Sequence, residues 1–478
     1  MKSKQTKTIL LSCVVILAVA CMCIGVVLIG GVGVSLIWPL EFQGQPGNTN
    51  TTPLNRTPME NTPDDSLTPE NSITVTPPHE AELPDELADT IAEIESQVMD
   101  LRGLEIEQPV DHTLISSDEL EQIVLKDFLA EYGDEEAQQD VLILSTVGLL
   151  PKGFDLKGLY QSLYTEQIAG FYEEESKEIF IVQGEKFGGS EKLTYAHEFT
   201  HVLQDATFRF NDGLGYNEEA CQGDSERCAA INALIEGDAS LTEILWFESY
   251  ATIWDYRDIS RDFNNFDSTI LDSAPYFLAS DLYFPYDYGL TFVQTLYDEG
   301  GFEAVDAAFE NTPLSTEQIL HPERYPEDVP VQVTLPDLSD VLDESWILFD
   351  RDILGEWYTF LILSQGYEEA FRLDEDLASI AAEGWGGDAY AFYINEDTHE
   401  VTFVLDTTWD STSDALEFRD AFEGYAQQRW ESADEKILGQ PTWLGENLVA
   451  TLLQDGDRTV WVISANEDLV QSILTALQ

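Results

Sequence analysis

The pattern of apolar positions divides the chain into three parts. Residues 9–40 form an almost continuous apolar run. The next stretch, residues 43–85, is rich in proline, threonine and asparagine and has almost no regular apolar spacing. From residue 83 onward, apolar positions recur with the periods of helices and strands, which predicts a folded region.

The first apolar run is long enough to span a bilayer, and Lys2, Lys4 and Lys7 precede it. A cleaved secretory signal has a shorter apolar core. We therefore predict an uncleaved, single-pass transmembrane anchor over residues 1–42, with its lysines in the cytoplasm and the rest of the chain outside. The sequence LAVA before Cys21 is a weak lipoprotein motif, and lipidation of that cysteine is the alternative.

The composition of residues 43–85 predicts a disordered stalk. Such a segment buries too little apolar surface to offset the loss of chain entropy on folding, and its prolines keep it extended. We expect the stalk to hold the folded part away from the membrane.

The folded part begins with helical spacing over residues 83–101 and 117–132. Residues 168–172 and 178–182 then favour a β-hairpin, because β-branched and aromatic residues flank the polar turn EEESK. A glycine-rich connection and a further helix follow the hairpin. Later segments, 290–325 and 340–383, are mostly helical by period.

The C-terminal region changes character after GWGGD at residues 384–388. Strands at 389–394 and 401–409, a helix at 414–430, a hairpin at 447–464 and a helix from Asp468 give the order ββαββα. This order predicts a small α+β domain.

The charge of the chain narrows the range of partners. Asp and Glu number 91 against 22 Lys and Arg, which gives a formal net charge of −69. Such a surface repels polyanions, so we expect no nucleic-acid partner. Hydrophobic residues make up 44%, enough for a buried core.

Candidate chemistry appears in the helix after the hairpin, in the sequence TYAHEFTHVLQD. His197 and His201 are four residues apart and share one helical face, so both imidazoles can bind one Zn²⁺. Glu198 lies about 100° round the helix, where it can reach the bound water as a general base. A solvent-facing pair on an acidic helix is the alternative, but only six histidines occur in the chain.

Around residues 160–310 the sequence resembles the gluzincins, the zinc metallopeptidases whose third ligand is a glutamate on a later helix. That ligand often sits in Glu-Gly-x-Ala, and this chain has ALIEGDASLTE at residues 233–243. The resemblance therefore assigns Glu236, with Glu243 as the alternative. Asp205 and Asp238 are candidates for second-layer acceptors of the imidazole N–H groups, or are simple surface charges.

A second correspondence lies in YDYGLTFVQTLYDEGGF. Aminopeptidase-N-like gluzincins carry a tyrosine three residues before a glycine, ahead of a helix, and its phenol stabilises the oxyanion. Tyr286 matches this position, while Tyr288 and His321 remain alternatives. The chain lacks a recognisable exopeptidase signature, so the choice between endo- and exo-cleavage stays open.

The resemblance implies a zincin-like α+β catalytic domain over residues 86–335, with a hairpin, an active-site helix and a mainly helical subdomain. Residues 336–478 then form a helical connection and the C-terminal domain. The expected function is zinc-dependent hydrolysis of peptide or protein substrates at the cell membrane. A membrane-tethered binding protein with a structural zinc site is the alternative, and a non-peptidase zinc hydrolase is a third reading.

The cysteines agree with a location outside the cytoplasm. Three of the five lie in the apolar run, which leaves Cys221 and Cys228 in an oxidising compartment. We expect them to form a disulfide in the loop between the histidine helix and the Glu236 helix.

Overall fold

The computed structural model describes residues 83–478, except 124–131, 168–169, 175, 183–186, 266–267 and 434–435. The predicted anchor and nearly all of the predicted stalk lie outside these described residues. Within them, no helix combines the length and the apolar character needed to cross a membrane.

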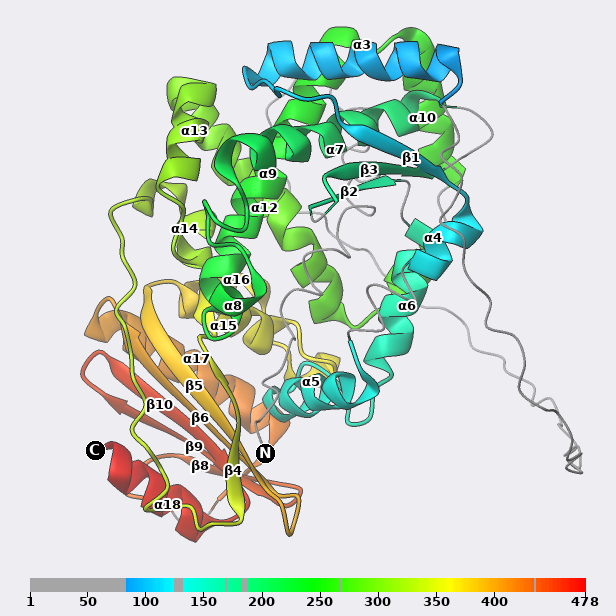
Figure 1. Cartoon of the computed structure of the whole chain (residues 1–478). Helices are drawn as coiled ribbons and strands as arrows, with labels where there is room; N and C mark the ends of the chain where they lie inside the picture. Colours follow the sequence, from blue (N-terminus) through cyan, green and yellow to red (C-terminus); the bar gives the residue numbers. More distant parts are fainter. Residues whose placement is uncertain are drawn as a thin grey trace, which may run out of the picture.

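The described chain is a mixed α/β structure with two sheets (Figure 1). The smaller sheet has the strand order β1-β3-β2, so β2 lies at its edge. β3 pairs in parallel with β1 and antiparallel with β2. The elements of this first part are α3 (Asp85–Arg102), β1 (Asp111–Ile115), α4 (Ser117–Ile123), α5 (Asp134–Val147), α6 (Leu156–Gln167), β2 (Gly170–Glu173) and β3 (Glu178–Val182).

A group of helices follows the small sheet. Two long helices, α9 and α12, pack closely against each other, and α7 packs against α9, α3 and β2. The helices are α7 (Gly189–Phe208), α8 (Glu218–Cys221), α9 (Ser225–Tyr250), α10 (Ile253–Asn265), α11 (Thr269–Ser273), α12 (Tyr276–Gly300), α13 (Phe302–Glu310), α14 (Thr316–Leu320) and η2 (Pro322–Arg324).

The C-terminal part is built on a seven-stranded antiparallel sheet with the order β4-β5-β6-β10-β9-β8-β7. Its elements are β4 (Trp346–Asp352), α15 (Gly355–Ser364), η3 (Glu369–Phe371), α16 (Glu375–Ala382), β5 (Trp385–Asn395), β6 (Val401–Trp409), α17 (Thr412–Arg429), β7 (Glu431–Ser432), β8 (Thr442–Gly445), β9 (Leu448–Asp455), β10 (Arg458–Ser464) and α18 (Glu467–Leu477).

Strand β10 shows how alternation covers both faces of this sheet. Trp461 packs in the cluster that contains Phe422 of α17, whereas Val460 and Val462 pack in the cluster that contains Ile473 of α18. Because successive strand residues point to opposite faces, α17 and α18 cover opposite faces of the sheet, as Figure 1 shows. The cluster on the α17 face continues into the helices of the first part.

Several elements agree with the sequence predictions. Helix α3, the β2–β3 hairpin, the histidine helix α7 and strand β6 lie where the pattern places them, and the predicted C-terminal elements are present as β5, β6, α17, β9, β10 and α18. The described part of the predicted helix 117–132 is α4.

Two predictions were wrong in part. Residues 340–383 contain the edge strand β4, whose apolar run WILF lacks the alternation of a half-buried strand. The C-terminal sheet also gains β7 and β8, which are too short to give a periodic signal.

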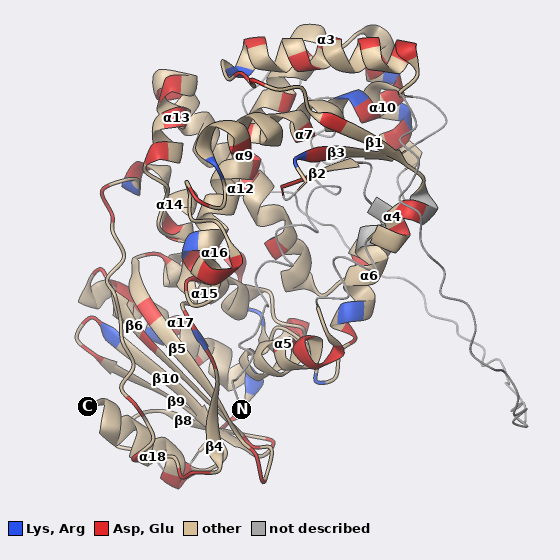
Figure 2. Ribbon diagram, in the orientation of Figure 1, with Lys and Arg blue, Asp and Glu red and all other residues tan. Residues whose placement is uncertain are grey.

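Acidic residues are spread over both parts of the molecule, and basic ones are few (Figure 2). Some carboxyl groups are also buried. Burial raises the pKa of Asp352 to about 7 and that of Asp388 to about 6, although backbone N–H groups donate hydrogen bonds to both. The ordinary value for these groups is 3.8, so the folded chain holds protons that the unfolded chain has lost.

We therefore expect the protein to lose stability as pH rises from about 5 to about 8. A carboxyl group with a raised folded-state pKa contributes stability below its unfolded pKa, and that contribution disappears as pH rises through the folded value. Thermal unfolding at about 0.5 M salt, which screens surface charges, measures this dependence. Asp388→Asn should make it shallower, and a melting temperature that rises with pH would contradict the prediction.

Candidate metal centre

Helix α7 carries three of the predicted site residues on a buried scaffold. Its residues from Leu193 to Asp205 are all buried, and Tyr195, Phe199 and Leu203 pack in the core cluster shared with α3. Because residues four apart share a helical face, His197 and His201 lie together on the side towards α9. The apolar side of α7 therefore fixes the position of both imidazoles.

Glu236 of α9 completes a compact donor set. Its Oε2 lies 3.2 Å from Nε2 of His197 and 3.4 Å from Nε2 of His201. The two histidines and Glu236 are all buried, and their ligand atoms lie within 4.8 Å of one another. Two atoms at Zn–ligand distances of 2.0–2.1 Å and a tetrahedral angle are about 3.3 Å apart. The donor set therefore fits a zinc ion in both chemistry and spacing.

A close crossing of α9 and α12 explains why Glu236 and Tyr286 lie beside α7. Gly237 and Gly289 meet at this crossing, where a Cβ on Gly237 would lie 2.2 Å from the carbonyl oxygen of Gly289. A Cβ on Gly289 would lie equally close to the carbonyl oxygen of Ala233. Only glycine permits this backbone approach at both positions.

The Nδ1 atoms of the two histidines, which point away from Glu236, have different partners. Nδ1 of His197 lies 3.1 Å from Oε2 of Glu243, and Nδ1 of His201 lies 2.9 Å from Oε1 of Gln204. Glu243, the alternative third ligand, therefore contacts His197 on the side away from Glu236. Such partners fix the tautomer and the ring orientation of a ligating histidine.

The two predicted second-layer aspartates are both buried, and they differ in role. Asp238 reaches His201 only through Gln204, whose Nε2 donates to Asp238 at 2.8 Å. Asp205 accepts hydrogen bonds from the hydroxyl of Tyr172 and the backbone N–H of Phe210, and it pairs with Lys177. Its recorded partners include no imidazole, so it ties the hairpin to α7 instead.

Glu198 has the environment of a general base. Its Oε2 accepts a hydrogen bond of 3.0 Å from the backbone N–H of Tyr172 in strand β2. Its Oε1 is buried and has no hydrogen-bond partner among the described residues. Burial raises the pKa of Glu198 to about 7, against the opposing charges of His201 and His197.

The donor set also attracts positive charge. Burial lowers the pKa of His197, but hydrogen bonds and charges from Glu236 and Glu243 outweigh burial and raise the pKa to about 10. Burial raises the pKa of Glu236, but His201 and His197 outweigh it and lower the pKa to about 2. The carboxylates thus favour a cation between them.

Tyr286 lies beside the donor set, although it differs from the expected position ahead of a helix. It lies inside α12, directly after Pro285, and its ring centroid is 6.2 Å from that of His197. The side chain of Tyr288 is instead partly exposed and lies tilted against the ring of Trp357, and His321 is paired with Glu356 at 2.8 Å. The structure brings Tyr286, and neither alternative, into contact with a predicted metal ligand.

Sequence reasoning missed two residues that support the centre, Gln204 and Arg102. Gln204 follows His201 by three residues on the same helix, and this helical spacing could have indicated it. Arg102 lies 136 residues before its partner Asp238, and no local pattern indicates that contact.

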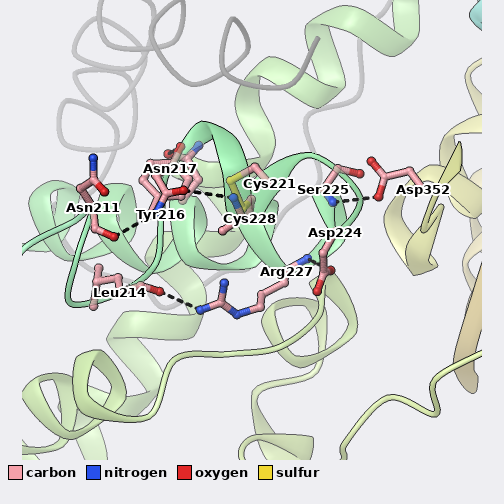
Figure 3. Close-up of a disulfide and its surroundings, with 12 residues drawn as sticks. Asn211, Leu214, Tyr216, Asn217, Cys221, Asp224, Ser225, Arg227, Cys228 and Asp352 are labelled. Atoms are coloured by element: carbon pink, nitrogen blue, oxygen red, sulfur yellow. Dashed lines mark hydrogen bonds between the residues drawn. A yellow bond between two sulfur atoms is a disulfide. The ribbon is translucent and has the colours of Figure 1, made fainter. Parts of the chain in front are cut away.

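The predicted disulfide joins Cys221, at the end of α8, to Cys228 in the first turn of α9 (Figure 3). Two nearby contacts tie the start of α9 to neighbouring segments. The guanidinium of Arg227 donates to the carbonyl of Leu214, and the backbone N–H of Ser225 donates to Asp352 before α15. The start of α9, the helix that carries Glu236, is therefore linked to both parts of the molecule.

A separate cleft of about 1340 Å³ lies between α5, α12 and strands β4 and β5. The three metal donors do not line it. It comes nearest to them along α9, where the lining residue Asn232 precedes Glu236 by one helical turn. Pro285 of α12, next to Tyr286, also lines it.

A second acidic group lies around Arg324, outside the metal centre. Glu317, Asp328 and Asp410 lie close together, but Nη1 of Arg324 lies 2.6 to 3.3 Å from a carboxylate oxygen of each. The arginine already occupies the position between the carboxylates, so this group is an ion-pair cluster.

Comparison with known proteins gives one match. Residues 347–474 match a family described as a domain of unknown function, DUF8575. Neither a curated protein nor a solved structure matches the chain. The matched segment runs from β4 into α18, so it contains the C-terminal sheet and excludes the candidate metal centre.

Proposed function

We propose that the protein is a membrane-anchored, extracytoplasmic zinc metallopeptidase of the gluzincin type. One observation carries this proposal: three buried donors converge, with Oε2 of Glu236 3.2 and 3.4 Å from the two imidazole nitrogens, beside a buried carboxylate that has one oxygen without a partner among the described residues. His197, His201 and Glu236 would hold the ion. The anchor and the stalk enter the proposal from the sequence alone.

Each site residue has a role that follows from its position. When bound, zinc supplies a Lewis acid that acidifies water and polarises a peptide carbonyl. Glu198, whose Oε1 has no other partner among the described residues, takes a proton from the attacking water and returns it to the leaving amine. Tyr286 donates its phenolic hydrogen to the oxyanion.

The edge strand β2 supports a polypeptide substrate. The N–H of Tyr172 points to Glu198 and not to β3, so the unpaired edge of β2 faces the general base. An extended peptide can add to such an edge through backbone hydrogen bonds. This arrangement would bring a peptide bond to Glu198.

A purely structural zinc site is the competing function. A structural site is usually closed by four protein ligands and needs no base beside them. Here three protein donors converge, and Glu198 stands next to them with a raised pKa. These features favour catalysis over a structural role.

The proposal is tested by chelation of the purified full chain. We expect one zinc ion per chain, cleavage of a casein substrate, loss of cleavage with a chelator and recovery when zinc is restored. Cleavage that persists after the zinc has been removed would contradict the proposal. Bound zinc without cleavage would favour the structural alternative.

A further inference from the structure

A chain of buried hydrogen bonds links α3 to the metal centre. Nε of Arg102, the last residue of α3, donates to both carboxylate oxygens of Asp238, at 2.8 and 3.0 Å. Asp238 accepts from Nε2 of Gln204 at 2.8 Å, and Oε1 of Gln204 lies 2.9 Å from Nδ1 of His201. The four side chains are between 0% and 4% exposed.

Asp238 determines the orientation of the Gln204 amide, that is, whether its oxygen or its nitrogen faces His201. The amide nitrogen of Gln204 has two acceptors, Asp238 and the carbonyl oxygen of Ile235 at 2.9 Å. The amide oxygen must therefore face His201, and it can only accept. His201 then carries its proton on Nδ1 and presents the lone pair of Nε2 to the donor set.

Arg102 keeps this arrangement in place by balancing the charge of Asp238. Its guanidinium also lies 2.6 Å from Asp306 and over the ring of Phe302, so it is held on several sides. Without Arg102, Asp238 would be a buried carboxylate without a balancing cation. The two hydrogen bonds from Nε that fix the position of its carboxylate would also be lost, and with them the fixed acceptor for the amide nitrogen of Gln204.

We propose that Arg102 is a positioning residue for the metal centre, which acts through Asp238 and Gln204 to orient His201. This inference rests on the proposed function. It makes α3 an integral part of the centre.

The test is the affinity of the full chain for Zn²⁺, measured by competition with a chelating dye. We expect Arg102→Met to weaken binding by up to about 10- to 100-fold, the range for losing a direct partner of a metal ligand, because the variant would disturb the contact of Gln204 with His201. When Co²⁺ replaces zinc in Arg102→Met, the visible spectrum should differ from that of the Co²⁺-loaded parent, because His201 is misoriented. Arg102→Lys, which retains the charge, should recover part of the affinity.

Two controls separate positioning from loss of stability. Asp306 is the other ion-pair partner of Arg102, and among the described residues no contact joins it to Gln204. The variant Asp306→Asn should therefore bind zinc like the parent. Val98→Ala removes apolar packing of α3 and should lower the melting temperature while the folded protein keeps the parent affinity and Co²⁺ spectrum. If Arg102→Met does not fold, Arg102→Met combined with Asp238→Leu removes both charges together with the acceptor that fixes Gln204, and it should show the same loss of affinity.

The inference is overturned if the variants that lack Arg102 bind zinc as tightly as the parent. It is also overturned if Val98→Ala loses as much zinc affinity as those variants do. If the parent still binds zinc and cleaves casein in those cases, only the role of Arg102 is wrong. If the parent binds no zinc, the proposed function and this inference both fail.

Discussion

Replacing Glu198 by glutamine should nearly abolish peptide hydrolysis and leave one zinc ion per chain in place. The amide keeps the shape of the side chain but cannot take a proton from water. General bases contribute about 10² to 10⁴ in rate, so we expect a fall in kcat of that size. Zinc content and casein cleavage, measured on the same preparation, test this result.

The metal ligands provide the matched controls for Glu198→Gln. His197→Ala and His201→Ala should lose both zinc and activity, because each removes a donor of the three-atom set. Glu236→Gln should weaken zinc binding sharply, since it removes the only carboxylate charge in that set. Full activity in Glu198→Gln would contradict the proposed peptidase mechanism.

Replacing Tyr286 by phenylalanine should lower kcat by about 10² to 10³ and leave zinc content and KM nearly unchanged. The hydroxyl acts where negative charge develops in the transition state, whereas the ring, which packs beside His197, is retained. Steady-state kinetics of the zinc-loaded protein measure this separation.

Tyr288→Phe is the matched control, because its ring contacts Phe284 and Trp357, away from the donor set. It should behave like the parent. If Tyr288→Phe or His321→Ala shows the kinetic defect and Tyr286→Phe does not, the oxyanion donor has been assigned to the wrong residue.

The sequence indicates the parts of the site that depend on local spacing. The two histidines and Glu198 follow from helical geometry within α7, and the hairpin before it follows from the β-branched and aromatic residues on both sides of its polar turn. Choosing Glu236 over Glu243 required the resemblance. Only the structure shows that the two glutamates contact opposite nitrogens of His197.

Contacts between distant segments could not be predicted. The contact of Arg102 with Asp238 depends on where α3 packs, and the edge strand β4 depends on its pairing with β5. A periodic pattern reports which face of an element is buried, but not which element covers it. The same limit explains why Asp205 could be chosen as a histidine partner when it contacts the hairpin.

The glycine crossing between α9 and α12 limits how the catalytic groups can move. Gly237 directly follows Glu236, and Gly289 lies three residues after Tyr286. Because the helix backbones touch there, Glu236 and Tyr286 belong to one rigid unit. His197 and His201 come from α7, which packs against α9. The three donors therefore come from two helices, and an ion bound by all three would join α7 to the α9–α12 pair.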